Sequence, residues 1–477
     1  MGEPVASANS NRMGTVTHSS MEPISSEDET ARTSRLKGIS SHESGAREIA
    51  FQQRYASEPF EDPSPMPIVP LAKHVEGDLI SGTFVASCQV VSAFLFLFCS
   101  WGVIGCYGTF FVYFKDTLVP TSTESELAWI GSIQHFLAVT VGILTSPWVD
   151  YGHMYLMCFA GSLLVVLGEM MASLGYRFVH LFFAHGFCIG LGAGLLYLPC
   201  ITCCSEYYSS KHRGKATGIA TLGSSIGSLI FPIIFNKLEP KIGYPWTMRT
   251  IGFIMLGLLV CALLLYRPRR EAMEPRQLFS SHIFKDQTYL VYVFGYFLGM
   301  LGLYVPNFFL PSFGKHHQFS PSIFPFTTSF LKAGGIMGRL LSICLTPRIG
   351  VFNLYAPRTL IAAVLVYCWI PVQQQGSFLA MVILYGFFTG SILSSTPNII
   401  SVITEDVSEV NIRLGIASLV AALGILVGPP IAGALLEVEP PAYLRAQIFS
   451  AVFLTLSGLF MITTRILKVG WNPMIKY

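Results

Sequence analysis

The sequence predicts an all-α membrane protein with twelve transmembrane helices. Charged residues make up only 12% of the 477 residues, whereas hydrophobic residues make up 52%. A soluble domain carries about 25% charged residues, so we expect lipid rather than water to face most of the surface. Long stretches without charge recur along the chain. In lipid such stretches must be helical unless they show the short alternating segments of a barrel, which are not seen here.

The first half of the chain contains six of these stretches. A helix needs about 20 apolar residues to cross a bilayer. The six stretches contain no Asp, Glu, Lys or Arg, and they lie at residues 83–114, 127–149, 151–168, 178–205, 216–236 and 250–266.

The second half repeats the pattern. A seventh span is predicted at 287–314, and an eighth at 316–347 is interrupted only by Lys332 and Arg339. The charge-free stretch 359–404 is too long for one helix, and the turn-like residues 371–376 divide it into a ninth and a tenth span. The last two spans are predicted at 414–436 and 446–464.

The order of these segments predicts two six-helix bundles joined by a basic linker. Pro199, Glu206 and Arg213 in the first half are followed at similar offsets by Pro397, Glu405 and Arg413 in the second half, which is typical of transporters with parallel repeats. We therefore expect a disordered N-terminal tail (1–77), a first bundle (78–266), a linker (267–286), a second bundle (287–468) and a short C-terminal tail (469–477).

Basic residues predict the orientation of the chain. Loops rich in Lys and Arg stay in the cytoplasm. The set of loops predicted on one side of the membrane holds about twice as many Lys and Arg residues as the set on the opposite side. The even number of spans then places both termini in the cytoplasm. A plasma membrane is the default location of this multi-pass protein, with a vacuolar membrane as the alternative. The richer set is Lys211, Arg213, Lys215, Arg267, Arg269, Arg270, Arg276, Lys285, Arg348, Arg358, Arg413, Arg465, Lys468 and Lys476.

Several classes of protein are excluded. The net charge of +3 and the lack of a basic patch with interleaved aromatic residues argue against a nucleic-acid partner. Cys200, Cys203 and Cys204 lack a second ligand pair, so no metal site is expected. No phosphate-binding loop and no nucleophile–base pair occurs, so we expect neither an enzyme nor a bound cofactor.

Several short motifs occur in order along the chain. Two of them follow the fourth span, at 212–220 and 223–227, and the others lie at 129–134, 147–152, 338–339, 350–353, 413–415 and 428–433. Together these segments resemble the fungal monocarboxylate-transporter-like branch (monocarboxylate porter family) of the major facilitator superfamily, in which 212–220 and 223–227 look like the loop and fifth-helix signature.

The resemblance implies the major facilitator fold, a central cavity and alternating access. It implies a secondary active transporter, often driven by protons, but it does not fix the substrate. We expect a small organic solute, which is a carboxylate or an aromatic compound or secondary metabolite. A facilitated-diffusion carrier and a nutrient sensor on a transporter fold are the alternatives, and we expect a monomer in the bilayer. Gly108 and Gly335 stand where lactate carriers have a lysine and an acid, which argues against proton–lactate symport.

Lys332 and Arg339 are the first candidates for substrate binding. They lie seven residues apart in the eighth span, nearly on one helical face. A charge in the middle of a membrane costs about 2.5–3.5 kcal/mol on insertion scales, so it normally faces a cavity or a partner. The functional interpretation is an anion site, and the alternative is a structural ion pair or, for Arg339, a packing arginine.

Other polar residues in the spans complete the candidate set. Glu169, His135 and His185 are candidates for proton coupling. Alternatively, Glu169 extends to the membrane interface and the histidines are satisfied core residues. By resemblance, Asp150 and Arg213 belong to an inner gate, with helix capping as the alternative. The candidate cavity residues are Tyr107, Gln134 and Asn307, and Trp101 and Tyr304 could stack on a ring.

Overall fold

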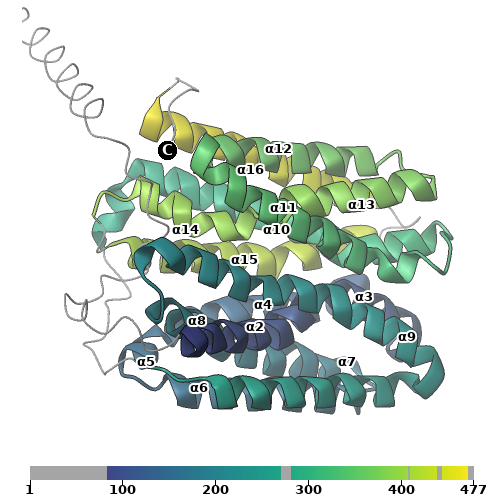
Figure 1. Cartoon of the computed structure of the whole chain (residues 1–477). Coiled ribbons are helices and arrows are strands. Elements are labelled where there is room, and N and C mark those ends of the chain that lie inside the picture. The colour runs from purple at the N-terminus through teal and green to yellow at the C-terminus, as the bar shows by residue number, and fades with distance from the viewer. Residues whose placement is uncertain (1–82, 270–280, 407–408, 438–442, 471–477) are drawn as a thin grey trace, which may run out of the picture. The chain divides into compact units, whose positions relative to one another are not determined.

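The computed structural model describes residues 83–269, 281–406, 409–437 and 443–470, and in these ranges the regular structure is entirely helical (Figure 1). The predicted N-terminal tail, most of the linker and most of the C-terminal tail lie outside the described residues. The first group of helices comprises α2 (Thr83–Gly105), α3 (Tyr107–Tyr113), η1 (Phe114–Leu118), α4 (Glu124–Leu144), α5 (Ser146–Asp150), α6 (Met154–Ala172), α7 (Phe178–Leu181), η2 (Phe182–Cys188), α8 (Ile189–Glu206) and α9 (Ser210–Leu265).

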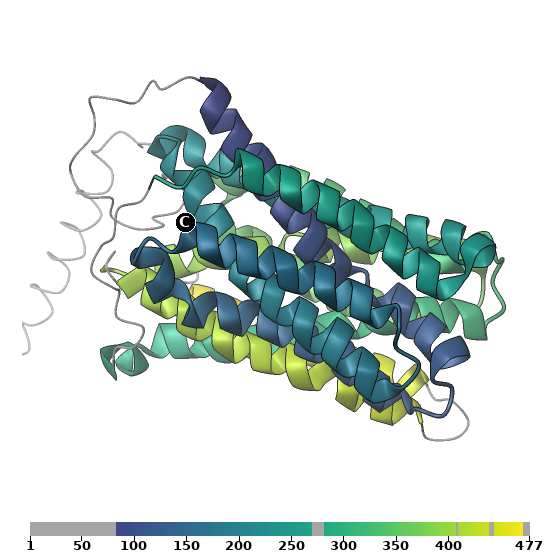
Figure 2. The ribbon, with the colours of Figure 1, turned by 90° about the horizontal axis from the view of Figure 1, so that it is seen from below.

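The second group follows the basic segment and lies beside the first in Figure 1, and in Figure 2, seen from below, most helices of the first group lie nearer the viewer. Contacts between α4 and α15, between α9 and α11 and between α3 and α10 connect the two groups. The second group comprises η3 (Ser281–Lys285), α10 (Gln287–His316), η4 (Phe324–Phe326), α11 (Thr327–Ile349), α12 (Val351–Trp369), α13 (Gln375–Thr389), α14 (Ile392–Ile403), α15 (Val410–Leu436) and α16 (Tyr443–Val469).

The described helices account for twelve membrane crossings. Ten segments are long and apolar enough to span a bilayer. One of them, within α9, provides two crossings, because its helix is interrupted at Gly243 (φ 75°) between Pro240 and Pro245. Figure 1 shows the chain reversing its direction there. α11 is the twelfth crossing, since its 23 residues have the necessary length although it carries three basic residues. The predicted all-α fold is confirmed, whereas the boundaries of the two bundles stay a prediction.

Several predicted span boundaries are wrong, and three of them show the reasons. The eighth span begins at Thr327 rather than 316, because α10 continues to His316 and a turn follows in which Gln318 has a φ of 53°. The ninth and eleventh spans begin at Val351 and Val410 rather than 359 and 414. In both cases a basic residue that sequence patterning assigns to a loop lies inside the helix.

Those two basic residues, Arg358 and Arg413, are buried and hydrogen-bonded. Arg358 donates to the hydroxyls of Ser342 and Ser391. Arg413 pairs with Glu409 and with Asp286, which also accepts from the backbone N–H of Tyr289 and thereby caps α10. Partial burial opposes ionisation of Asp286, but these hydrogen bonds outweigh it and hold the pKa of the carboxyl below its usual value.

Glycines allow the helices of the second group to approach closely. A Cβ atom on Gly338 of α11 would lie 1.8 Å from the carbonyl oxygen of Phe387 of α13. A Cβ on Gly386 of α13 would lie 2.0 Å from the carbonyl oxygen of Leu331 of α11. Small residues of this kind replace bulky side chains at membrane helix interfaces. They fix the position of α11, which carries Lys332.

We expect Gly338→Val to destabilise the protein. The added side chain overlaps the backbone of α13, and overpacking costs about 1–3 kcal/mol or more. Thermal unfolding in detergent should show a lowered midpoint. Gly257→Val is the matched control, because a Cβ on Gly257 meets no atom within 4 Å. Equal stability of the two variants would contradict the close packing of α11 on α13.

Candidate functional site

The first membrane span is broken in its middle. α2 ends at Gly105 and α3 begins at Tyr107, with Cys106 outside the helical region (φ −104°, ψ 12°). A Cβ on Gly105 would lie 2.2 Å from the hydroxyl of Ser228 of α9, and a Cβ on Gly108 would lie 2.3 Å from the carbonyl oxygen of Asn307 of α10. The two glycines therefore let helices of both groups approach the break.

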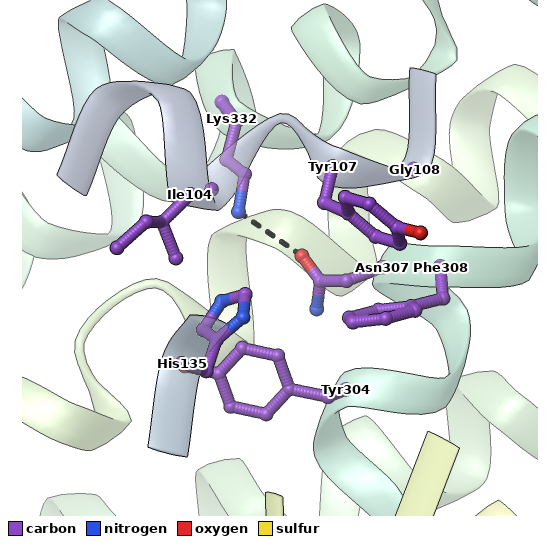
Figure 3. A pocket seen from close by; sticks show the side chains of 9 residues that line it. Ile104, Tyr107, Gly108, His135, Tyr304, Asn307, Phe308 and Lys332 are labelled. Carbon is purple, nitrogen blue, oxygen red and sulfur yellow. Dashed lines mark hydrogen bonds between the residues drawn. The ribbon is translucent and has the colours of Figure 1, made fainter. Parts of the chain in front are cut away.

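A small cavity of about 10 Å³ lies at this break (Figure 3). It receives side chains from α2, α3 and α4 of the first group and from α10 and α11 of the second. The two groups therefore share one site. Its lining residues are Ile104, Gly105, Tyr107, Gly108, His135, Tyr304, Asn307, Phe308 and Lys332.

Lys332 provides the cation of this cavity. Its Nζ donates to Asn307 Oδ1 at 3.1 Å, the contact drawn in Figure 3. Among the described residues, no carboxylate lies within 4.0 Å of this amine. An ammonium group has three donors. The amine therefore has capacity left for a ligand that accepts hydrogen bonds.

Aromatic rings form the walls around the amine. The ring centroids of His135 and Tyr304 are 4.7 Å apart, and those of Tyr107 and Phe308 are 5.2 Å apart. His135 Nδ1 lies 2.8 Å from the carbonyl oxygen of Gly131. Because a carbonyl only accepts, Nδ1 carries a proton. The cavity thus combines one cation, one amide and one imidazole with flat apolar faces.

Arg339, the second predicted cation, is not among the residues that line the cavity. Its Nη1 donates to the carbonyl oxygen of Thr221 of α9 at 3.1 Å, and its Nε donates to that of Gly390 at 3.3 Å. The side chain therefore joins α11 to a helix of the first group and to the end of α13.

Gln134 and the other predicted titratable residues form a second cluster. Gln134, Glu169 and His185 are fully buried and lie together, although they come from α4, α6 and η2. His135 faces the cavity while its neighbour Gln134 faces this cluster, because successive residues of a helix point in directions about 100° apart. The burial of Glu169 shows that the alternative of an extension to the membrane interface is wrong.

The predicted gate residues lie at the side of the bundle where α2 begins and α16 ends, here called the termini side. Asp150 is the last residue of α5 and is buried. Arg213 lies in the first turn of α9, and its Nε donates to the carbonyl oxygen of Ser205 at 3.2 Å. Both residues therefore lie where short connections link the helices.

Contacts between the groups cover the cavity on the side opposite the termini. Thr109 of α3 donates to Thr328 of α11 at 3.1 Å, and Lys315 of α10 forms an ion pair with Asp116 of η1. The amide of Asn236 donates to the carbonyl oxygen of Pro325 at 2.7 Å. These contacts hold the two groups together on that side.

Sequence reasoning found part of this site. The predicted substrate-binding residues Lys332, Asn307 and Tyr107 line the cavity, and so does Tyr304, which the sequence predicts as a stacking residue. Trp101 instead packs on Tyr197, with ring centroids 5.5 Å apart. Three lining residues were missed, and the only available signal was the glycine-rich break of the first span. They are Ile104, Gly105 and Phe308.

The contact between Lys332 and Asn307 gives a prediction for stability. We expect Asn307→Leu to lower the free energy of unfolding, because it removes the hydrogen-bond acceptor of a partly buried cation, a loss of about 1–3 kcal/mol. The loss should be smaller in a Lys332→Met background. A double-mutant cycle of thermal unfolding in detergent measures this coupling. Equal losses in both backgrounds would contradict the pairing.

Comparison with known proteins identifies the family. The model of the Major Facilitator Superfamily matches residues 93–377. The chain is 32% identical over 358 residues to the MFS-type transporter dbaD of Emericella nidulans, covering 75% of this chain and 80% of the relative. It is also 32% identical over 364 residues to the aspyridones efflux protein apdF of the same organism, covering 76% of this chain and 74% of the relative.

A solved structure supports the same fold. The D-xylose-proton symporter superposes with a TM-score of 0.63 at 13% sequence identity, and the match covers 80% of this chain and 97% of the symporter. At that identity the likeness concerns the fold alone. The family match over residues 93–377 and the two relatives at 32% identity show that this chain is a member of the major facilitator superfamily.

Proposed function

We propose that this protein is a secondary active transporter that moves a small organic anion with an aromatic ring across a membrane by alternating access. The observation that carries this proposal is the Lys332 amine, which lies among aromatic rings in a cavity shared by both helix groups and has no carboxylate partner in the described structure. The family consists of transporters rather than enzymes, in agreement with the prediction that the chain is not an enzyme.

The charge of the cavity supports an anionic solute. A buried cation is costly unless it is paired and hydrogen-bonded, and here one amide oxygen is the partner that Lys332 has. A carboxylate or phenolate would complete the pair by a charge-assisted hydrogen bond. The rings of Tyr304, Phe308 and Tyr107 would receive the apolar body of the solute.

The size of the cavity supports alternating access. Pockets for drug-sized ligands hold about 300–1,000 Å³, whereas this cavity measures only about 10 Å³. Because its walls belong to both helix groups, separation of the groups would enlarge it. The contacts between Thr109 and Thr328 and between Lys315 and Asp116 would then act as the closure on one side.

The direction and the substrate class are also proposals. The name of the relative apdF describes efflux of aspyridones, and we extend that direction to this chain as efflux of an acidic secondary metabolite. Membership of the monocarboxylate porter branch is the finer assignment. Gly108, against which Asn307 packs, leaves the first span without a cation, so Lys332 would bind the anion instead.

The membrane and the gate complete the proposal. The bias of basic residues supports both termini in the cytoplasm, and we assign the protein to the plasma membrane as a monomer. Efflux then requires solute entry from the termini side. We assign Asp150 and Arg213, which lie on that side, to the gate through which the solute enters.

We expect Lys332→Met to slow transport of 4-hydroxybenzoate. Loss of a hydrogen bond to a charged group costs about 1.5–3 kcal/mol, which corresponds to roughly tenfold to a hundredfold in rate or affinity. The measurement is release of radiolabelled probe from proteoliposomes at a pH at which the acid is ionised, with empty liposomes as the blank. Wild type should prefer the acid over 4-hydroxybenzamide, a neutral compound of similar size.

Lys468→Met is the matched control. Lys468 lies near the C-terminal end of α16, which contributes no residue to the cavity lining, and it pairs with the exposed Glu405. This variant should release the probe at the wild-type rate. An unchanged rate for Lys332→Met would refute the anion site. Binding without release would favour the sensor, and release that a pH gradient cannot drive uphill would favour facilitated diffusion.

A further inference from the structure

A buried polar cluster lies entirely within the first helix group, apart from the cavity. Gln134 of α4, Glu169 of α6 and His185 of η2 are each fully buried. His185 Nε2 and Glu169 Oε2 are 3.9 Å apart. An acid and a base thus face each other in the apolar part of the protein, where ionisable groups are costly and mark functional sites.

The hydrogen bonds of this cluster are incomplete. Neither oxygen of Glu169 has a hydrogen-bond partner, and neither does His185 Nε2. The Gln134 Nε2 donates to the carbonyl oxygen of His185 at 2.9 Å and lies 3.4 Å from His185 Nδ1. A donor facing Nδ1 leaves the ring proton on Nε2, so that it points toward Glu169.

The groups that surround the pair from neighbouring helices are weakly acidic or apolar. From α3, the ring of Tyr107 lies 5.9 Å from the imidazole, and the thiol of Cys106 lies within electrostatic reach of Glu169. From α9, Tyr244 is within the same reach, and its hydroxyl donates to the carbonyl oxygen of Ala172. Among the described residues, His185 is the one basic side chain within 4.0 Å of Glu169.

The packing of the cluster limits what can bind there. η2 is a π-helix, a feature that often occurs at functional sites. A Cβ on Gly168 would lie 2.8 Å from the carbonyl oxygen of Ala184, and one on Gly186 would lie 3.0 Å from that of Ile130. The three helices are therefore in close contact around the pair. The described residues contain no group of three or more metal-ligating side chains, so a proton is the ligand that fits.

We propose that Glu169 and His185 together form the proton-binding site of this carrier. The loaded pair holds one exchangeable proton, shared as carboxylic acid and neutral imidazole or as carboxylate and imidazolium. The unloaded pair is a carboxylate and a neutral imidazole, and the released proton passes to water. The role in transport rests on the function proposed above, whereas the binding of the proton does not.

Tyr107 connects this pair to the cavity. The centroid of its ring lies 5.9 Å from that of His185 and 5.2 Å from that of Phe308 of α10, and its hydroxyl donates to the carbonyl oxygen of Leu127 at 2.6 Å. Tyr107 also begins α3, directly after the break in the first span. A movement of α3 that opens the cavity would therefore change the access of water to the pair.

Infrared difference spectroscopy of the reconstituted full-length protein tests the site without a solute. On a step from alkaline to acidic buffer, wild type should gain a carboxylic-acid C=O band at the high frequency typical of an apolar site. Glu169→Gln should lose that band, and His185→Gln should shift the pH at which it forms. Glu405→Gln, which removes a carboxylate that is 92% exposed, should keep it.

Two infrared results would overturn the proposal. One is a Glu169→Gln difference spectrum that keeps every pH-dependent carboxylic-acid band of the wild-type spectrum. The other is a Glu169 band that persists unchanged at every pH, because such a proton does not exchange. Size-exclusion profiles of the same samples identify misfolded variants, and His185→Gln then decides whether the band depends on the pair.

A transport assay with 4-hydroxybenzoate separates this proposal from the previous one. Glu169→Gln should retain exchange of the probe at equal concentrations on both sides but lose uphill accumulation in a pH gradient, whereas Lys332→Met should lose both. Uphill accumulation by Glu169→Gln at the wild-type level would overturn the coupling role. If wild type does not carry the probe, the proposed substrate class fails, and the infrared result still decides the proton site.

Discussion

The cost of an unpaired polar group in an apolar interior underlies most of this structure. It requires helices throughout the described spans, and it explains why the buried arginines Arg358 and Arg413 are held by hydroxyls or carboxylates. Against that background, an incompletely paired group stands out. Lys332 in the cavity and Glu169 in the first helix group are two such groups, and both lie where helices from different parts of the chain meet.

The break at Cys106 relates these two positions to each other. A continuous helix from Thr83 to Leu118 would carry its side chains in one regular pattern, whereas the break lets the segments before and after it turn separately. Gly105 and Gly108 then allow close contact with α9 and α10. As a result Tyr107 lines the cavity and also packs on His185. One residue thus belongs to the surroundings of both the cation and the acid.

Much of the fold, but less of the site, could be predicted from the sequence. Hydropathy identifies the spans because an apolar environment makes charged side chains costly along the whole length of a span. It misplaced the starts of α12 and α15, because Arg358 and Arg413 are satisfied by partners distant in sequence. Lys332 was identifiable as a charge within an apolar span. By contrast, Phe308 has no local signal, and Gln134 and His135 could not be assigned to different sites before the rotation of α4 was known.

Lys332 and Arg339 of α11 show why position in the sequence does not decide a role. Lys332 and Arg339 are both basic residues of one span, and insertion costs treat them alike. Arg339 donates to two backbone carbonyls, so its charge stabilises the packing of three helix segments. Lys332 donates to a single side-chain amide beside a cavity. An incoming anion would have to displace backbone contacts at Arg339, whereas at Lys332 it would meet donors that are still unused. The difference in hydrogen-bond partners, rather than in charge, therefore assigns ligand binding to the lysine.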